Sequence, residues 1–439
     1  MKERLLAAVA RLERDTAGAP AWLVDGRRRA RDRFAEAGLP TTRDEEWKYT
    51  SLAPLLATDL DPAAEVEIDG VSEEAIAPFL MGDPSWRRLV FVNGRYSPKL
   101  SSVAFLPGGV RIGSLAEAVL TDAGALREHV AGDGDGDGFT ALNAALWRDG
   151  AFVLVPAGAV VPAPLHLVFV ATAPAAPTVG HPKNLIVLGE GSELTVVESY
   201  VAVGDDRYLT NAVTDIVAGA GARVDHYRLQ HESSRAFHVG RTRIAQQRDS
   251  AVTSCAITFG GRLARHDVHV VLGGEGAECA LNGLFVIGGA QHSDIHTVVD
   301  HVVPRGTSRQ LYKGVLDGRA RGVFNGRIVV RPGAQKTDAH QTNKNLLLAD
   351  GVEMDSKPQL EIFADDVKCS HGAADGQLAG DALFYLESRG FGEAAARALL
   401  TYGFASEVLG RIQEPTVRAR LEAALTARLR DGRVNEEMA

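Results

Sequence analysis

The 439-residue sequence is poor in cysteine, and this limits the chemistry that the chain can support alone. Its three cysteines, Cys255, Cys279 and Cys369, lie far apart, and no Cys-x-x-Cys pair occurs. Neither a disulfide framework nor a self-contained four-cysteine cluster site can therefore be written for it. A cysteine is more often a small buried apolar residue than a ligand. We expect that structural role for Cys255 and Cys279, which each lie inside an apolar strand pattern.

The sequence also lacks a long apolar run and an excess of basic residues. No stretch of about eighteen apolar residues occurs, so no transmembrane helix is expected. The apolar stretch at residues 5–9 is too short for the core of a signal peptide. A net charge of −9 argues against an electrostatic nucleic-acid binder. These absences predict a cytoplasmic globular protein without a nucleic-acid or membrane partner.

Motifs of several enzyme classes are missing as well. The sequence contains no GxxxxGK[ST] phosphate-binding loop, no GxSxG and no HExxH. Any ATP hydrolysis would therefore have to come from a partner. A β-helix enzyme acting on polysaccharides is a disfavoured alternative, because glycoside chemistry needs two carboxylates at one open groove. Adjacent Asp365 and Asp366 would point to opposite faces of a strand.

From about residue 152 the sequence carries short β-type runs with turn residues at a regular interval. The turns are Gly191, Gly221, Asp249, Gly276 and Gly306, and by subtraction they are 30, 28, 27 and 30 residues apart. Such a period, without a helical pattern in between, is typical of a coil of stacked strands. An antiparallel sandwich, the alternative, would place turns roughly every 8–12 residues. We therefore predict a mainly β fold, a right-handed parallel β-helix.

Helical patterns flank the β-type region on both sides. Leu5, Val9 and Leu12 follow helical spacing near the start. Near the end, two stripes have four-residue spacing: Leu400, Phe404, Val408 and Ile412, then Val417, Leu421, Leu425 and Leu429. The chain thus divides into an N-terminal helical and mixed region (1–145), a β-helix core (146–376) and a C-terminal helical domain (377–439). The C-terminal stripes could face the core or dock a partner.

The most reactive side chains lie at the end of the β-type region. Cys369 and His371 are two residues apart, so an extended strand would present a thiol and an imidazole on one face. These are donors that iron, sulfide and zinc chemistry prefers. The structural alternative is that both side chains are packed within a late strand.

Two further histidine groups could bind a metal, although this is the less favoured interpretation. His292, Asp294 and His296 would share one face of a strand, and His266 and His269 are three residues apart. Polar side chains in a β-helix more often hydrogen-bond between turns. We therefore expect structural roles here.

Several segments resemble the SufB/SufD scaffold proteins of the SUF iron–sulfur cluster assembly system. They are RDEEWKYTSL (43–52), FVLVPAGAVVPAPLHLVF (152–169), NGRIVVRPGAQKTDAHQTNKNLLL (325–348), DSKPQLEIFADDVKCSHGAA (355–374) and DALFYLESRG (381–390). The likeness spans nearly the whole chain and is densest over residues 320–410. The short N-terminal region and the first segment favour the SufD branch.

The resemblance implies a non-catalytic scaffold subunit, with a β-helix between helical ends. A SufD-type chain would pair with a SufB-type subunit through its late turns and bind a SufC-type ABC ATPase through its C-terminal helices. A cysteine desulfurase would supply sulfur indirectly. A transient iron–sulfur cluster would form at the subunit interface of the full complex, and none would be held stably by the isolated chain. The family's site histidine matches His371, with Cys369 two residues before it.

Alternatives within this family stay open at this point. The chain could be a SufB-like primary cluster-bearing scaffold, or it could form a homodimer when its partner is missing. Whether a flavin cofactor binds the complex is also open.

Overall fold

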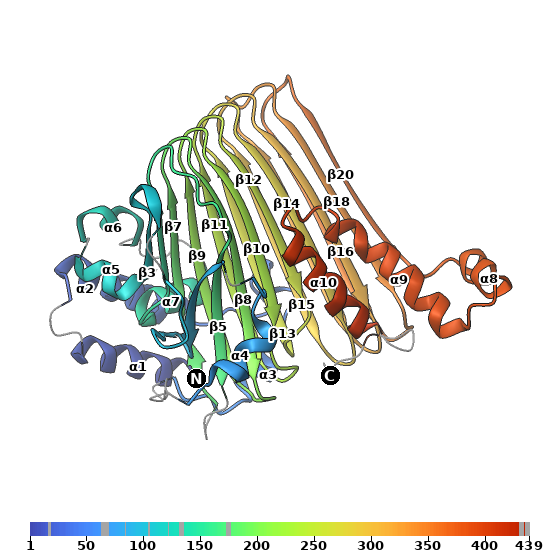
Figure 1. Cartoon of the computed structure of the whole chain (residues 1–439), viewed down its shortest axis with the longest axis horizontal. Helices are drawn as coiled ribbons and strands as arrows, with labels where there is room; N and C mark the ends of the chain where they lie inside the picture. Colours follow the sequence, from blue (N-terminus) through green and yellow to red (C-terminus); the bar gives the residue numbers. More distant parts are fainter. Residues whose placement is uncertain are drawn as a thin grey trace.

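A coil of parallel strands forms most of the protein, with helices at both ends of the chain (Figure 1). The computed structural model describes residues 1–15, 19–62, 70–83, 85–103, 106–121, 123–130, 136–172, 177–429 and 434. The predicted β-helix, here called the β-solenoid, and its flanking helical regions are confirmed.

The solenoid is flattened into two sheets, and successive strands alternate between them. Sheet 1 runs in the order β2 (Arg95–Tyr96), β1 (Arg87–Val92), β5 (Leu165–Thr172), β8 (Glu193–Val203), β10 (Arg223–His231), β12 (Ala251–Thr258), β14 (Glu278–Ile287), β16 (Thr307–Leu316), β18 (Asp338–Leu347) and β20 (Lys368–Gly376). Sheet 2 runs in the order β19 (Glu353–Ile362), β17 (Arg321–Val330), β15 (His292–His301), β13 (Leu263–Leu272), β11 (Phe237–Gln246), β9 (Leu209–Ala218), β7 (Lys183–Leu188), β4 (Ala151–Val155) and β3 (Arg111–Ser114). The short β6 (Val179–Gly180) pairs with β9.

One turn of the solenoid takes close to thirty residues. The starts of β8, β10, β12, β14 and β16 are 30, 28, 27 and 29 residues apart by subtraction. The predicted turn residues precede these strands, and φ is 62° at Gly191, 65° at Gly221 and 74° at Gly276. Glycine adopts this left-handed conformation readily because it has no Cβ. The predicted period is therefore confirmed, and the sandwich alternative is wrong.

The two sheets enclose an apolar interior in which equivalent residues of successive turns stack. Leu194, Val224 and Val252 are paired in register along sheet 1, and all three are buried. Phe91, Phe169 and Tyr200 form a ladder of stacked rings, with centroids 5.0 and 4.8 Å apart. In-register parallel pairing places like positions above one another, so each turn buries its apolar face against the next.

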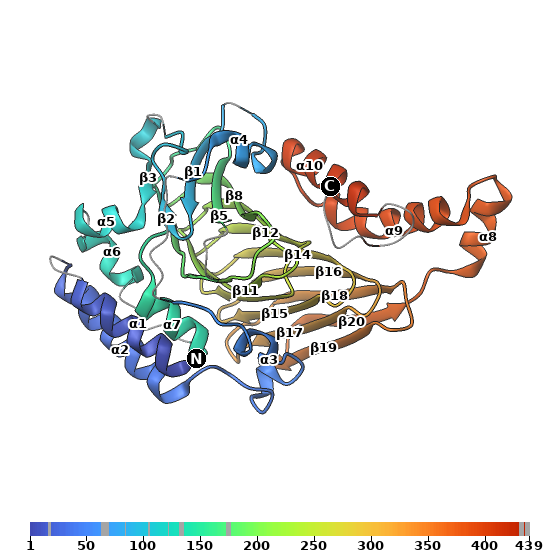
Figure 2. The same ribbon diagram turned by 90° about the horizontal axis from the view of Figure 1, so that it is seen from below.

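The N-terminal helices pack beside the first turns (Figure 2). The main ones are α1 (Lys2–Asp15), α2 (Ala21–Ala37), α5 (Leu115–Thr121), α6 (Ala123–Val130) and α7 (Gly138–Leu146). Short helices follow α2 and the early strands: η1 (Glu45–Trp47), α3 (Ala53–Leu56), α4 (Glu73–Ile76), η2 (Ala77–Phe79) and η3 (Pro107–Gly109). Leu5, Val9 and Leu12 of α1 are buried, as their spacing predicted. The same region supplies β1, which extends sheet 1 by parallel pairing with β5.

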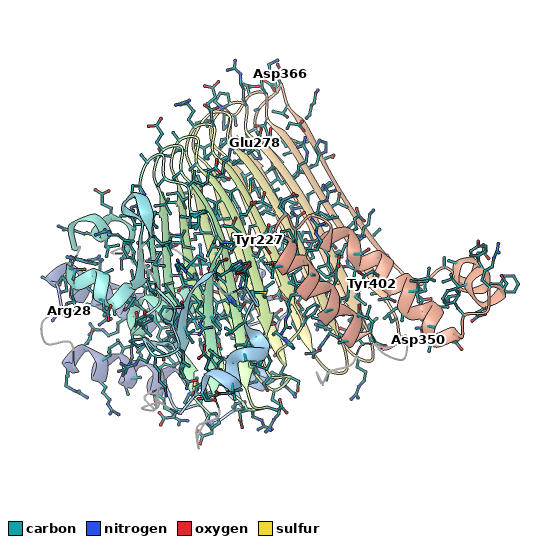
Figure 3. All side chains as sticks on the ribbon, in the orientation of Figure 1. Arg28, Tyr227, Glu278, Asp350, Asp366 and Tyr402 are labelled. Atoms are coloured by element: carbon teal, nitrogen blue, oxygen red, sulfur yellow. The ribbon has the colours of Figure 1, made fainter. Side chains whose placement is uncertain are left out.

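The C-terminal helices are α8 (Gly380–Ser388), α9 (Glu393–Leu409) and α10 (Pro415–Arg428). The apolar stripes of α9 and α10 pack on the outer face of sheet 1, where Val408 and Leu421 join a cluster with Tyr227. Figure 3 labels Tyr227, whose hydroxyl accepts backbone N–H bonds from Gln413 (3.1 Å) and Glu414 (3.3 Å). Helix α8 projects away from the solenoid (Figure 1). Within the described part of the chain, every helix is too short or too polar to cross a membrane.

Candidate functional site

The last turn of the solenoid forms an open end. Among the described residues, β20 pairs only with β18 and β19 pairs only with β17, so the outer edge of each strand has no strand partner. Helices cover the first turns, whereas most residues of β20 are exposed. The open end therefore presents unpaired backbone groups together with the side chains of β19 and β20.

Cys369 and His371 lie side by side on this open end. Parallel pairing places Cys369 next to Ala339 and His371 next to Gln341. Because β20 is extended, the thiol and the imidazole share one face, as the spacing predicted. Cys369 is half-buried and packs against the apolar cluster that contains Ala339, and His371 is exposed. Burial raises the pKa of the Cys369 thiol, so the thiol is protonated at neutral pH in the isolated chain.

The inward-facing row of β20 ends in a hydrogen-bonded cluster that the sequence did not reveal. Asn345 Nδ2 donates to Asp375 Oδ1 at 2.7 Å, and Ser356 Oγ lies 3.3 Å from the same oxygen. Ser356 Oγ also lies 3.0 Å from Asn343 Oδ1. The cluster joins β18, β19 and β20 at the open end. One indication of this cluster is present in the sequence: Asp375 lies four residues after His371, which places both side chains on the same face of an extended strand.

The opposite face of β20 is held to β18 by a polar contact. His340 Nδ1 lies 2.5 Å from Ser370 Oγ, and His340 Nε2 lies 2.9 Å from Asp338 Oδ1. Arg309 adds an ion pair to Asp338 at 2.9 Å. These contacts fix the strand that carries Cys369 and His371.

His292, Asp294 and His296 share the outer face of β15, as their spacing predicted, but they belong to an ion-pair network. Asp294 Oδ2 accepts from Arg265 Nη1 at 2.7 Å and from Thr50 Oγ1 at 2.6 Å. Asp294 Oδ1 lies 2.9 Å from His296 Nε2. His292 Nε2 lies 2.9 Å from Thr50 Oγ1. Each of these side chains is already engaged.

The network attaches the N-terminal segment 43–52 to the face of sheet 2, and we call it the latch. Glu46 Oε2 lies 3.1 Å from His296 Nδ1, and the Arg265 guanidinium lies over the Trp47 ring, 4.0 Å from its centroid. Burial alone would lower the pKa of His296, but Asp294 and Glu46 raise it to about 9. A protonated imidazole has no lone pair for a metal. Among the described residues, no group of three or more His, Cys, Asp or Glu is placed to hold a metal ion.

The remaining candidates are separated or buried. His266 faces the interior, where its Nε2 lies 2.9 Å from Thr242 Oγ1. His269, three residues further along the same strand, points to the other face. Cys255 and Cys279 are both buried, as predicted, and burial raises the pKa of each thiol to about 12.

The fold and this geometry define a class of protein: a parallel β-solenoid with one helix-covered end and one open end that carries a thiol and an imidazole. Two family models match the sequence, the "SUF system FeS cluster assembly, SufBD core domain" over residues 169–404 and the "SufBD protein N-terminal region" over residues 13–167. The chain therefore belongs to the SufBD family of the SUF iron–sulfur cluster assembly system.

Individual relatives support the SufD branch. An iron–sulfur cluster assembly SufBD family protein of Synechocystis is 35% identical over 415 residues, covering 92% of this chain and 91% of the relative. SufD of Escherichia coli is 33% identical over 397 residues, or 90% of each chain. SufD of Bacillus subtilis is 26% identical over 423 residues, or 94% of this chain and 95% of the relative. The resemblance read from the sequence is confirmed.

Proposed function

We propose that this chain is a non-catalytic, cytoplasmic scaffold subunit that assembles iron–sulfur clusters together with a SufB-type subunit. The observation that carries the proposal is the open end, where Cys369 and His371 lie beside the free edges of β19 and β20. A free strand edge is suited to pairing with a strand of a second protein. This end offers one thiol and one imidazole, whereas clusters are usually held by four ligands. The other ligands, and the sulfur that a cysteine desulfurase provides, would therefore reach a transient cluster through the partner.

The test of this site is the variant His371→Ala in the complex with a SufB-type subunit. We expect the rate of cluster formation from iron and a sulfur donor to fall at least tenfold, because an exposed ligand is removed. The exposed position of His371 predicts an unchanged melting temperature. Lys344→Ala, at an exposed position on the outer face of β18, is the comparison variant. An unchanged rate in His371→Ala would remove His371 from the site.

Helix α8 is the proposed docking site for a SufC-type ABC ATPase. Phe384 and Tyr385 on this helix are 72% and 56% exposed, and Phe391 and Leu399 beside it are each 46% exposed. Aromatic side chains grouped on a projecting helix are typical of a protein interface. The chain has no phosphate-binding loop of its own, so a partner has to supply ATP hydrolysis.

The docking proposal predicts that the double variant Phe384→Ser, Tyr385→Ser weakens ATPase binding at least tenfold. These side chains are solvent-exposed in the isolated chain, so the fold should be unaffected. Leu120→Ser is the matched control, because Leu120 is 66% exposed on α5, away from α8. Binding is measured by calorimetry with the purified ATPase. An ATPase that does not bind the parent chain at micromolar concentration contradicts the proposal.

A homodimer is the second candidate assembly, because the open end could pair with a copy of itself. Light scattering of the chain alone and with a SufB-type subunit distinguishes the two cases. Displacement of the homodimer by the partner supports the heteromeric scaffold. A SufB-like primary role is less favoured, since one thiol is present at the open end and the other two cysteines are buried.

A further inference from the structure

A buried amide without a hydrogen-bond partner lies directly below His371. Gln341 is 2% exposed, and neither Nε2 nor Oε1 has a partner among the described residues. The next inward-facing side chains of the same strand, Asn343 and Asn345, are both hydrogen-bonded. Burying an amide with no partner is costly, and natural proteins rarely do so without a reason.

Strand register places His371 next to Gln341, on the uncovered side of β18. Gln341 pairs with His371 on β20 and with Gln310 on β16. Neighbouring strands are about 4.8 Å apart, so side chains in one column touch when both point to the same side. Gln341 points into the solenoid, and His371 occupies the equivalent position of the uncovered last turn. The structure places the Gln341 amide against Gly326 of the opposite sheet, so the contact with His371 requires a rotation of the Gln341 or the His371 side chain.

Gly326 on the opposite sheet keeps the space that this amide occupies. A Cβ at position 326 would lie 2.2 Å from Gln341 Nε2. Gly326 is not among the glycines with positive φ, so backbone conformation does not require a glycine there. The Phe324 ring lies 2.8 Å from the same point, so space for the Gln341 and Phe324 side chains together is the physical reason.

We propose that Gln341 is a positioning residue for His371. Its carboxamide binds one ring nitrogen, which fixes the tautomer and directs the other nitrogen toward the open end. Histidine ligands are generally oriented by such a second hydrogen bond, and losing it commonly costs a factor of ten or more in metal affinity or activity. The importance of this contact for cluster assembly rests on the proposed function, whereas the contact itself does not.

The contact is tested on the isolated full-length chain by NMR of ¹⁵N-labelled histidines. The signals of His371 are those lost in His371→Ala. The parent should show one protonated and one unprotonated ring nitrogen, and Gln341→Leu should shift both toward the averaged values of a free imidazole. Gln247→Leu makes the same change at an exposed turn between β11 and β12, away from the open end, and should alter nothing.

Identical His371 signals in the parent and in Gln341→Leu would overturn the proposal. Replacing the buried amide by an apolar side chain should leave the melting temperature unchanged or higher, because its proposed partner His371 is exposed. Gln341→Met replaces Gln341→Leu if the latter does not fold. A marked fall in melting temperature in both variants, with unchanged His371 signals, would show a purely structural role.

The consequence for assembly is measured in the complex with a SufB-type subunit. Gln341→Leu should lower the rate of cluster formation about tenfold, while Gln247→Leu keeps the parent rate. If His371→Ala abolishes assembly but Gln341→Leu has no effect on rate or NMR signals, the positioning proposal fails and the proposed function stands. If the NMR signals shift but His371→Ala assembles normally, the positioning proposal stands and the proposed site fails.

Discussion

At the scale of single residues, the latch shows how buried charges can stabilise a contact between distant segments. Asp294 is enclosed by Arg265, His296 and Thr50, and His296 reaches Glu46, which is 250 residues away in the sequence. Burial alone would raise the pKa of Asp294, but Arg265 and His296 hold it well below its usual range. The folded protein therefore favours the ionised carboxylate of Asp294 and the protonated imidazole of His296.

The raised pKa of His296 predicts that stability falls at alkaline pH. A histidine with a folded pKa of about 9 and an ordinary value of 6.5 stabilises the fold fully below pH 6.5. This contribution is lost as the pH rises through 9, and it amounts to on the order of 3 kcal/mol. Asp294 has a lowered pKa, so its contribution to stability is lost only in acid. It therefore does not change the free energy of unfolding between pH 6.5 and 9. The free energy of unfolding in urea at pH 6.5 and 9 measures the loss.

A variant separates His296 from the other titrating groups. His296→Gln should be less stable at pH 6.5 and should lose clearly less stability than the parent between pH 6.5 and 9. His269→Gln is the control, because burial lowers the pKa of His269 and it is already neutral across this range. Equal pH dependence in the parent and His296→Gln would contradict the assignment.

At the scale of elements, the C-terminal helices divide between packing on the core and exposing apolar side chains that could dock a partner. Helices α9 and α10 cover the outer face of sheet 1, with Val408, Leu421 and Leu425 buried, whereas α8 exposes its aromatic side chains. Deleting residues 381–439 would thus uncover apolar residues of sheet 1. Point variants on α8 are the sharper test of partner binding.

A tyrosine hydroxyl of sheet 1 helps to attach the start of α10, in addition to the buried apolar side chains of this helix. Tyr227→Phe removes the acceptor for the N–H groups of Gln413 and Glu414 and should cost about 1–2 kcal/mol of local stability. We expect faster hydrogen exchange across residues 415–428, with little change in the solenoid. Tyr402→Phe on α9 is the control, and it also removes a hydroxyl from a half-buried ring. Equal exchange in both variants would show that the hydroxyl does not hold α10.

The repeating elements could be predicted from the sequence, whereas the latch could not. Turn residues such as Gly191, Gly221 and Gly276 recur because each turn of the solenoid needs a left-handed residue at the same place. The spacing of Cys369 and His371 likewise placed them on one face. No local pattern could show that Thr50 and Glu46 contact β15, because docking of the N-terminal segment is decided by packing of the whole fold.

At the scale of the whole molecule, the two ends of the solenoid differ. The first turns are covered by the N-terminal helices, and the last turn leaves two strand edges and its inward-facing side chains uncovered (Figures 1 and 2). Strands of a second protein can therefore add to both sheets at the end that carries Cys369 and His371. This asymmetry places the unpaired edges of β19 and β20 together with Cys369 and His371 at one end of the molecule.

The asymmetry predicts that cluster formation requires a second subunit. The isolated chain offers one protonated thiol and one imidazole at its open end, and both other thiols are buried with a pKa of about 12. Because a stable cluster usually needs four deprotonated or neutral soft ligands, anaerobic incubation with iron and sulfide should give little visible absorbance per chain. The complex with a SufB-type subunit should give at least tenfold more, and Cys369→Ser should lower that yield. A stable cluster on the isolated chain would mean that its own side chains suffice, and the open end would then not be half of a shared site.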